Sequence, residues 1–279
     1  TNNTNASRSL YFSQNDGIAK IENNVALTSH TFNGNVNSNS GVWMGNNPIN
    51  GCLVFNNNGG NTIHLWGLQQ VTFAGNIMSE AGSSGLSINQ SVRANFSGVP
   101  KTYCGTTTIN SGATLQISSN RNLGSLTLNP GGKLIIDAGC TLTLSGTFTG
   151  GGTIENYGTI ELTGPTLFPG STTTVAAMNN LRINNLNGVT FNNAITISGQ
   201  LILSEGIITT SATNLLTIAN TSHLAISGGS SSSFINGPVT WRLPTNFAGG
   251  FTYTIPVGKG TPYMTMSLIL PLPGLAKST

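Results

Sequence analysis

Seven acidic residues are the first candidates for chemistry, because carboxylates that converge in one groove can act as general acid and base or hold calcium. They are Asp16, Glu22, Glu80, Asp137, Glu155, Glu161 and Glu205. Only Glu155 and Glu161 are close in sequence, and the turn expected between them places their carboxylates on different faces of the chain. We therefore predict solvated surface carboxylates, no catalytic residue and no enzymatic activity.

The histidines and the glycine-rich segments offer no better basis for catalysis. His30, His64 and His223 lie far apart, and the Gly-x-Ser-x-Gly turn that presents a nucleophilic serine in many hydrolases does not occur. The glycine runs at 150–152 and 228–229 lack the following helix and the Lys-Ser/Thr pair of a phosphate-binding loop. We expect three surface histidines and no cofactor.

The three cysteines, Cys52, Cys104 and Cys140, have neither the CxxC spacing nor the neighbouring histidine that a zinc site requires. We predict no metal site. One interpretation pairs Cys52 with Cys104 in an oxidising compartment and leaves Cys140 buried. The other takes all three as small apolar residues that fill the core.

Three tryptophans, Trp43, Trp66 and Trp241, are the only candidates for ligand binding. An exposed indole on a flat face can stack on a sugar ring, which would make a surface polysaccharide the ligand. The competing interpretation is a place in the core or in a terminal cap, because tryptophan is highly buried on average.

Composition narrows the class of protein. Charged residues make up 6% of the 279 residues, against roughly 25% in an ordinary soluble domain. The ten basic residues that leave a net charge of +3 are scattered singly, so we expect no nucleic-acid partner. No run approaches 18 apolar residues, so we expect no membrane span. Gly, Asn, Ser and Thr replace the missing charge, which indicates a secreted, extracellular or cell-surface β-protein.

The apolar residues recur in very short strands of the form apolar–x–apolar, each followed by a turn. Two residues at positions i and i+2 point to the same side of a strand, so each pair can face one core. No segment shows the 3.6-residue pattern of a helix. The predicted inward positions are Leu115/Ile117, Leu126/Leu128, Leu134/Ile136, Leu142/Leu144, Ile154, Ile160/Leu162, Leu181/Ile183, Val189/Phe191, Ile195/Ile197, Leu201/Leu203, Ile207, Leu216/Ile218 and Leu224/Ile226.

Corners rich in Asn and Gly separate these strands, as at Asn187-Gly188 and Glu205-Gly206. Three such strands would give a coil of about 18–24 residues, which is within the range of repeat architectures. We therefore predict an all-β fold, a right-handed parallel β-helix (β-solenoid) over residues 1–227. The competing fold is a β-sandwich, which expects longer strands spaced by 8–12 residues.

Residues 228–279 differ in character. The low-complexity run at 228–233 predicts a Gly/Ser hinge. Longer alternating strands are expected at 239–243, 251–257 and 263–270. We interpret them as a small antiparallel β unit that caps the last coil, since open solenoid ends expose unpaired backbone, or as the start of a following domain.

Two stretches, NPGGKLIIDAGCTLTLSG at 129–146 and GGGTIENYGTIEL at 150–162, resemble coils of pectin-lyase-like β-helix proteins and autotransporter passengers. The segments 181–210, 235–244 and 253–260 resemble repeats of bacterial cell-surface proteins exported by the type IX secretion pathway. The resemblance implies secretion and a surface role, and it supplies no catalytic residue. No type IX sorting domain is recognised, so we expect a section of a longer polypeptide.

Three functions compete. The leading hypothesis is a non-catalytic structural or adhesive surface scaffold, with self-association into a filament, neighbouring domains or a surface polysaccharide as partner. The first alternative, a polysaccharide-active lyase or hydrolase, would need acids that converge, in one version with Arg93 or Arg121. The second is an ice-binding or carbohydrate-binding solenoid. Ice binding would need a coil-spaced Thr-x-Thr ladder, whereas the sequence shows threonine runs at 106–108 and 172–174.

Overall fold

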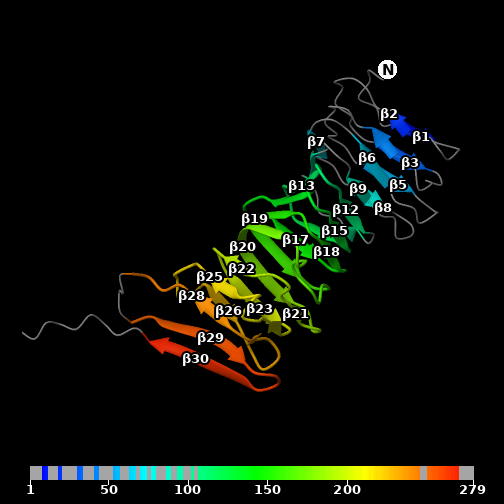
Figure 1. Ribbon diagram of the computed structural model, residues 1–279. Helices are drawn as coiled ribbons and strands as arrows, with labels where there is room; N and C mark the ends of the chain where they lie inside the picture. The colour runs from blue at the N-terminus through cyan, green and yellow to red at the C-terminus, as the bar shows by residue number, and fades with distance from the viewer. Residues whose placement is uncertain are drawn as a thin grey trace, which may run out of the picture.

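Figure 1 shows the computed structural model of the chain, in which short strands stack along one axis. The structure describes residues 106–245 and 250–269, together with the backbone of the strands between Arg8 and Tyr103. All regular elements in this part are β-strands, and all strand pairings are parallel except that of the last two strands. The fold is a parallel β-solenoid, which confirms the predicted class and contradicts the sandwich.

The chain order of the strands is as follows. The backbone before residue 106 forms β1 (Arg8–Tyr11), β2 (Ile18–Lys20), β3 (His30–Asn33), β4 (Gly41–Trp43), β5 (Leu53–Asn56), β6 (Ile63–Trp66), β7 (Gln70–Phe73), β8 (Ile77–Ser79), β9 (Leu86–Ile88), β10 (Arg93–Phe96) and β11 (Thr102–Tyr103). The later strands are β12 (Thr107–Ile109), β13 (Thr114–Ile117), β14 (Arg121–Leu123), β15 (Leu126–Leu128), β16 (Lys133–Ile136), β17 (Thr141–Leu144), β18 (Phe148–Gly150), β19 (Thr153–Leu162), β20 (Thr174–Asn184), β21 (Val189–Thr190), β22 (Ile195–Ile197), β23 (Leu201–Glu205), β24 (Ile208–Thr209), β25 (Leu216–Ile218), β26 (Ile226–Gly228), β27 (Ile235–Asn236), β28 (Val239–Trp241), β29 (Thr252–Gly258) and β30 (Tyr263–Ile269).

Successive coils place their strands in three rows. The first row contains β12, β15 and β18. The second contains β13, β16 and the first half of β19, and the third contains β14, β17 and the second half of β19. β19 and β20 are long because each strand passes from the second row into the third, with register shifts in their pairing.

The length of a coil follows from the register. Leu115 pairs with Leu134 and Leu134 with Ile154, so these coils take 19 and 20 residues, within the predicted 18–24. The coil between Ile208 and Ile235 takes 27 residues. It is longer because it includes the serine-rich run at 228–233.

That run lies inside a coil and not between two units. The backbone N–H groups of Ser230 and Ser233 donate to each other's carbonyl oxygens at 2.8 and 3.1 Å, so the run folds back as a closed turn. After it, β27 and β28 pair in parallel with β24 and β25. The parallel coils therefore continue to Trp241, beyond the boundary expected at residue 227, and the antiparallel part is limited to β29 and β30.

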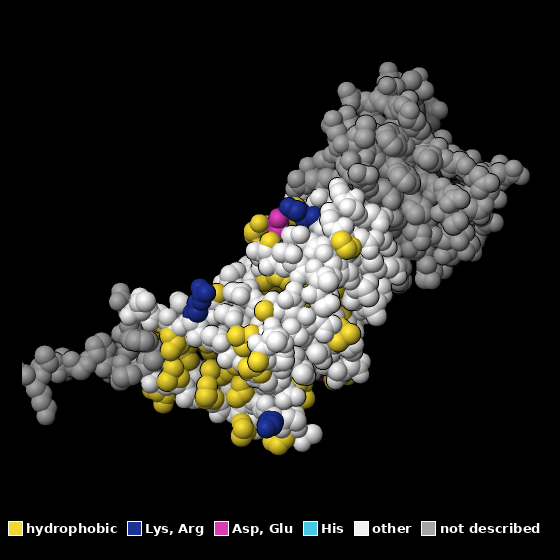
Figure 2. All heavy atoms as spheres, in the orientation of Figure 1, with side chains coloured by type: hydrophobic (Ala, Val, Ile, Leu, Met, Phe, Trp, Pro, Cys, Tyr) yellow, Lys and Arg dark blue, Asp and Glu magenta, His cyan; other side chains and the backbone are white. Residues whose placement is uncertain are grey.

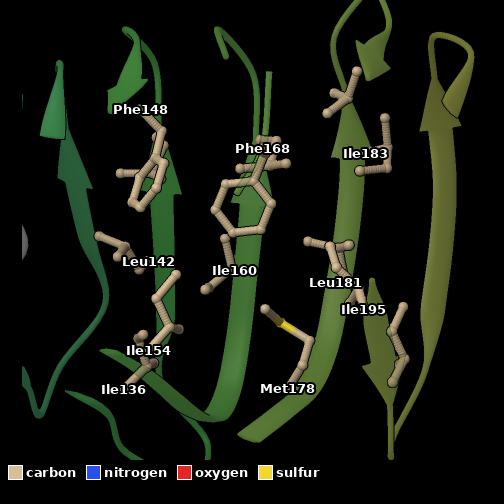
Figure 3. Packing of buried hydrophobic residues seen from close by; sticks show 14 of the residues in the cluster. Ile136, Leu142, Phe148, Ile154, Ile160, Phe168, Met178, Leu181, Ile183 and Ile195 are labelled. Atoms are coloured by element: carbon tan, nitrogen blue, oxygen red, sulfur yellow. The ribbon is translucent and has the colours of Figure 1, made fainter. Parts of the chain in front are cut away.

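The inward side chains of successive coils form one continuous core (Figure 3). Alternation along each strand produces this core, since the two apolar residues of a pair point inward and the residue between them points outward. The rings of Phe148 and Phe168 meet edge to face with their centroids 5.1 Å apart. The inward positions predicted from the sequence are buried at every site except Ile207 and Leu224.

Both exceptions come from the way a corner is built. Ile208 is buried in place of Ile207, because the preceding corner takes one residue more than the sequence pattern suggested. Leu224 is 64% exposed, and Ala225 occupies the core in its place. The backbone N–H of Ala225 donates to the carbonyl of Ser222 at 3.0 Å, which closes a turn with Leu224 on its outer side.

The stack ends in a two-stranded unit. β29 pairs in parallel with β27 and in antiparallel with β30. Tyr253 and Ile255 of β29 are buried, so this strand covers part of the last coil as the predicted cap would. β30 is the outermost strand (Figure 1), and Met264, Met266 and Leu268 are exposed on it, in the region where apolar side chains gather in Figure 2. No helix in the described residues could span a membrane.

Candidate functional site

A hollow of about 410 Å³ opens on the outer surface of the third row. It is lined by Asn120, Arg121, Asn122, Thr141, Thr143, Thr159, Glu161, Arg182 and Ile202. The register of β14, β17, β19 and β20 sets Asn122 beside Thr143, Thr143 beside Glu161, and Glu161 beside Arg182. These are the residues between the apolar pairs, so the same alternation that builds the core places a polar side chain from each coil in this line.

Glu161 lies at the centre of the hollow and is bound on several sides. Thr143 Oγ1 donates to its carboxylate at 3.1 Å, and Asn184 Nδ2 donates at 3.1 Å. An Arg182 guanidinium nitrogen lies 4.0 Å from the same carboxylate, with the Arg182 side chain 44% exposed. An ion pair of this length and exposure contributes little to stability, about 0–1 kcal/mol. The carboxylate therefore links three coils through hydrogen bonds.

Arg121 has a different place in the hollow. It is 6% exposed, and its backbone partner on β17 is the core residue Leu142, so its side chain starts on the inward side of β14. Burial lowers the pKa of the Arg121 guanidinium below its ordinary value. An arginine nevertheless stays protonated in proteins. It is the one buried charged side chain among the described residues, and it brings no second carboxylate with it.

The floor of the hollow contains an acceptor without a donor. Asn122 Oδ1 is buried and has no hydrogen-bond partner. A buried carbonyl oxygen in this state costs about 1–3 kcal/mol, and a hydroxyl or a water molecule in the hollow would remove that cost. The hollow therefore suits a small polar group that can donate a hydrogen bond.

The other described acids bind neighbours in adjacent coils. Lys133 Nζ lies 2.8 Å from Glu155 in the second row. Gln116 Nε2 donates to both carboxylate oxygens of Asp137 at 2.9 Å, and Ser118 donates to the same carboxylate. Each carboxylate thus has its own partners, and no group of three His, Cys, Asp or Glu residues able to hold a metal ion occurs among the described residues.

The predicted pair Glu155 and Glu161 does not form one site. Both residues lie on β19, but Glu155 belongs to the half that pairs with β16 and Glu161 to the half that pairs with β17. The strand turns a corner between them, with a register shift in its pairing with β20. The two carboxylates therefore face outward from different rows, as the sequence predicted.

Trp241 takes part in the end of the core. Its indole is half-buried against the core cluster, and Nε1 donates to the carbonyl of Asn220 at 2.8 Å. Its ring meets Tyr253 edge to face at a centroid distance of 5.1 Å. These contacts fix the indole between the last coil and β29. Trp43 and Trp66 belong to β4 and β6, and their side chains lie outside the described residues.

The remaining predicted residues are separate from the hollow. The imidazole of His223 stacks on the ring of Phe251 at a centroid distance of 4.3 Å. Cys140 is a free thiol, half-buried against the core. Burial first, and then the negative charge of Asp137, raise the pKa of this thiol. The predicted pairing of Cys52 with Cys104 lies outside the described residues.

The arrangement of threonines was missed in the sequence. In the run at 106–108 only Thr107 is buried, and its two neighbours face outward at β12. Equivalent outward positions at β15 and β18 are Ser125, Thr127, Thr147 and Thr149. The signal is the triplet hydroxyl–x–hydroxyl with a buried middle residue, once per coil. The run at 172–174 also has a buried middle residue, Thr173, but it lies outside this row.

Comparison of the chain with protein families, with characterised proteins and with solved structures gave no match. The resemblance to pectin-lyase-like and type IX surface proteins therefore stays a prediction, and function has to be argued from the geometry above.

Proposed function

We propose that this chain is a secreted, non-catalytic scaffold of the cell surface, structural or adhesive in role. The low charge and the Asn/Gly/Thr-rich composition support an extracellular place. The rod of stacked coils supports a structural one, since such a fold presents a long surface on a single continuous core.

One observation carries the proposal: outward polar side chains bond from coil to coil. Lys133 and Glu155 are 22 residues apart. Asn129 Nδ2 donates to Asn110 Oδ1 at 2.8 Å across 19 residues, and Thr127 bonds Thr149 across 22. Each of these separations is one coil. These side chains therefore strengthen the rod along its axis.

Catalysis on this fold would place different demands on the acids. A lyase or hydrolase needs two or more carboxylates around one substrate, at least one of them free to exchange a proton. Glu161 is already bound by Thr143 and Asn184, and Glu155 lies in another row and is bound by Lys133. This distribution favours the scaffold over the polysaccharide-active enzyme.

The partners belong to the same proposal. The hollow, with its amides, hydroxyls and the unpartnered Asn122 Oδ1, is the place where a surface polysaccharide would bind by hydrogen bonds. The exposed strand β30 is the place where a second copy, or a neighbouring domain of a longer polypeptide, would continue the structure.

Incubation of the full chain with a panel of neutral and acidic polysaccharides tests the assignment. We expect no reducing or unsaturated sugar product above background at any pH between about 4 and 9, the range in which carboxylates and imidazoles titrate. The Glu161→Gln variant serves as the control. Product formed by the wild type and lost in Glu161→Gln would replace the scaffold with an enzyme.

A further inference from the structure

The first row of strands presents six outward hydroxyl groups in two columns, here termed the hydroxyl array. The columns are Thr106, Ser125 and Thr147, and Thr108, Thr127 and Thr149. The backbone register aligns the second column directly, since Thr108 pairs with Thr127 and Thr127 with Thr149. For the first column, the N–H of Thr107 donates to Ser125 O and the N–H of Leu126 donates to Thr147 O, both at 2.8 Å.

The array is regular in both directions. Parallel strands lie about 4.8 Å apart, and residues i and i+2 on one strand about 6.6 Å apart, so the hydroxyls form a rectangular grid. The pairings β12–β15 and β15–β18 show no register shift, in contrast to β19–β20. The three residues beneath the grid, Thr107, Leu126 and Phe148, are buried in the core, which holds the outer side chains in place.

The side chains themselves are stiff. Threonine is branched at Cβ and has few χ1 rotamers, so a row of threonines is already ordered before it binds anything. Hydrogen bonds between coils add to this order. Thr127 Oγ1 and Thr149 Oγ1 lie 3.1 Å apart, and Thr147 Oγ1 lies 3.1 Å from Ser125 Oγ. Each hydroxyl has one donor and two acceptor positions, so capacity remains for water.

The chemistry of the array is uncharged throughout. Its six residues carry hydroxyls, with methyl groups on the five threonines. On one side the array is followed by Asn110 and Asn129, joined to each other by a 2.8 Å hydrogen bond. Neither the array nor these two positions contains a charged or an aromatic residue. The middle of the molecule in Figure 2 is accordingly mostly white.

A fixed grid of hydroxyls separated by methyl groups is suited to one kind of target. Water held by the hydroxyls takes up a repeat on the length scale of the oxygen positions in a crystal plane of ice, and the methyl groups restrict the water between them. Each contact is weak, so the contacts add up only where their positions are fixed in advance. We propose that the hydroxyl array binds the surface of ice.

A polysaccharide surface fits these observations less well. Sugar rings are commonly bound by the flat face of an aromatic side chain, and the array has none. The part of the chain that offers polar groups in a concave setting is the hollow, which lies on a different row. Crystalline polysaccharide is therefore an outcome that the experiment has to separate.

The molecule contains its own control surface. Thr196, Thr217 and Thr240 form another coil-spaced threonine column, on β22, β25 and β28. Their neighbours two residues earlier are Ala194, Leu215 and Pro238, so this column is single and no grid exists there. Thr127 and Thr217 are both half-buried and both lie between two buried or partly buried apolar residues, which makes them a matched pair.

The test uses the full chain as wild type, Thr127→Tyr and Thr217→Tyr, with far-UV circular dichroism to show that each is folded. The readouts are thermal hysteresis, the shape of single ice crystals, and the lowest concentration that stops ice recrystallisation. We expect faceted crystals with the wild type. We expect Thr127→Tyr to raise the recrystallisation threshold about tenfold and Thr217→Tyr to change it less than about twofold. Thr149→Tyr, at a more exposed position of the array, replaces Thr127→Tyr if that variant fails to fold.

Three results would overturn the proposal. The wild type could leave ice crystals round and unshaped at millimolar concentration. The two tyrosine variants could lose activity equally, which would place the effect outside the array. The chain could bind crystalline cellulose or chitin in a manner sensitive to Thr127→Tyr and show no effect on ice, which would assign the array to a glycan.

Discussion

Asparagine and glycine at the corners carry much of the architecture at the scale of single residues. Asn185 is 2% exposed, and its Nδ2 donates to Pro165 O of the previous coil at 2.9 Å, so a buried amide ties one corner to the next. Gly206 adopts φ +87°, and a Cβ at this position would lie 1.8 Å from the carbonyl oxygen of Asn185. The close approach of two corners thus requires a glycine. The abundance of these two residue types is explained by stacking.

A pair of glycine substitutions separates close approach from backbone conformation. Gly139 has a similar φ of +78° but open space around its Cβ position. We expect Gly139→Ala to cost about 1–2 kcal/mol, the strain of a side chain in the left-handed region. Gly206→Ala adds a collision with backbone and should cost about 3 kcal/mol or more. Urea unfolding followed by circular dichroism measures both, and equal losses would show that the corners are not packed as described.

At the scale of the strand, the period of two predicted nearly all of the core, because burial on one side leaves a direct trace in the sequence. Two kinds of feature left no such trace. The residue that begins a strand after a corner depends on how the corner turns, which is why Ile208 and Ala225 replace the predicted Ile207 and Leu224. Lateral alignment depends on the length of each coil: Thr107 meets Leu126 after 19 residues and Phe148 after 22 more. The hydroxyl array and the hollow both require that register, so neither could be predicted.

The alternation within a strand leads to a contrast between two isoleucines. Ile160 on β19 is fully buried in the core (Figure 3), whereas Ile202 on β23 is only partly buried and lines the hollow. We expect Ile160→Ala to lower the free energy of unfolding by about 2–5 kcal/mol, through lost burial and the cavity that remains. Ile202→Ala should lower it by less than about 1 kcal/mol. Denaturant midpoints measure the difference, and similar losses would contradict the inward–outward assignment.

At the scale of the whole molecule, the parallel coils end in a strand that has no partner on its outer side. Edge strands of natural sheets are usually short, charged or covered, because an unpaired edge can recruit another chain. Residues 263–269 of β30 contain no charged residue, and Met264, Met266, Leu268 and Ile269 are exposed. The predicted cap thus covers the last coil with β29 and leaves a new edge beyond it.

This edge predicts a specific route of self-association. Met266→Lys places a charge in the middle of β30 and should raise the concentration at which assemblies appear by about tenfold. Leu186→Lys is the control, since Leu186 is 79% exposed but lies in a corner between β20 and β21. Light scattering and electron microscopy of the full chain provide the measurement. An equal response of the two variants would mean that general hydrophobicity, and not the strand edge, drives association.

The 27-residue coil between Ile208 and Ile235 has one further consequence. Its surplus residues leave at the corners, and the strands before and after them still meet their partners in the adjacent coils. Such a corner is a natural insertion point: peptides grafted between Ser230 and Ser232 would be displayed at a fixed height along the rod, and grafts at several corners would be held at set intervals, like marks on a ruler.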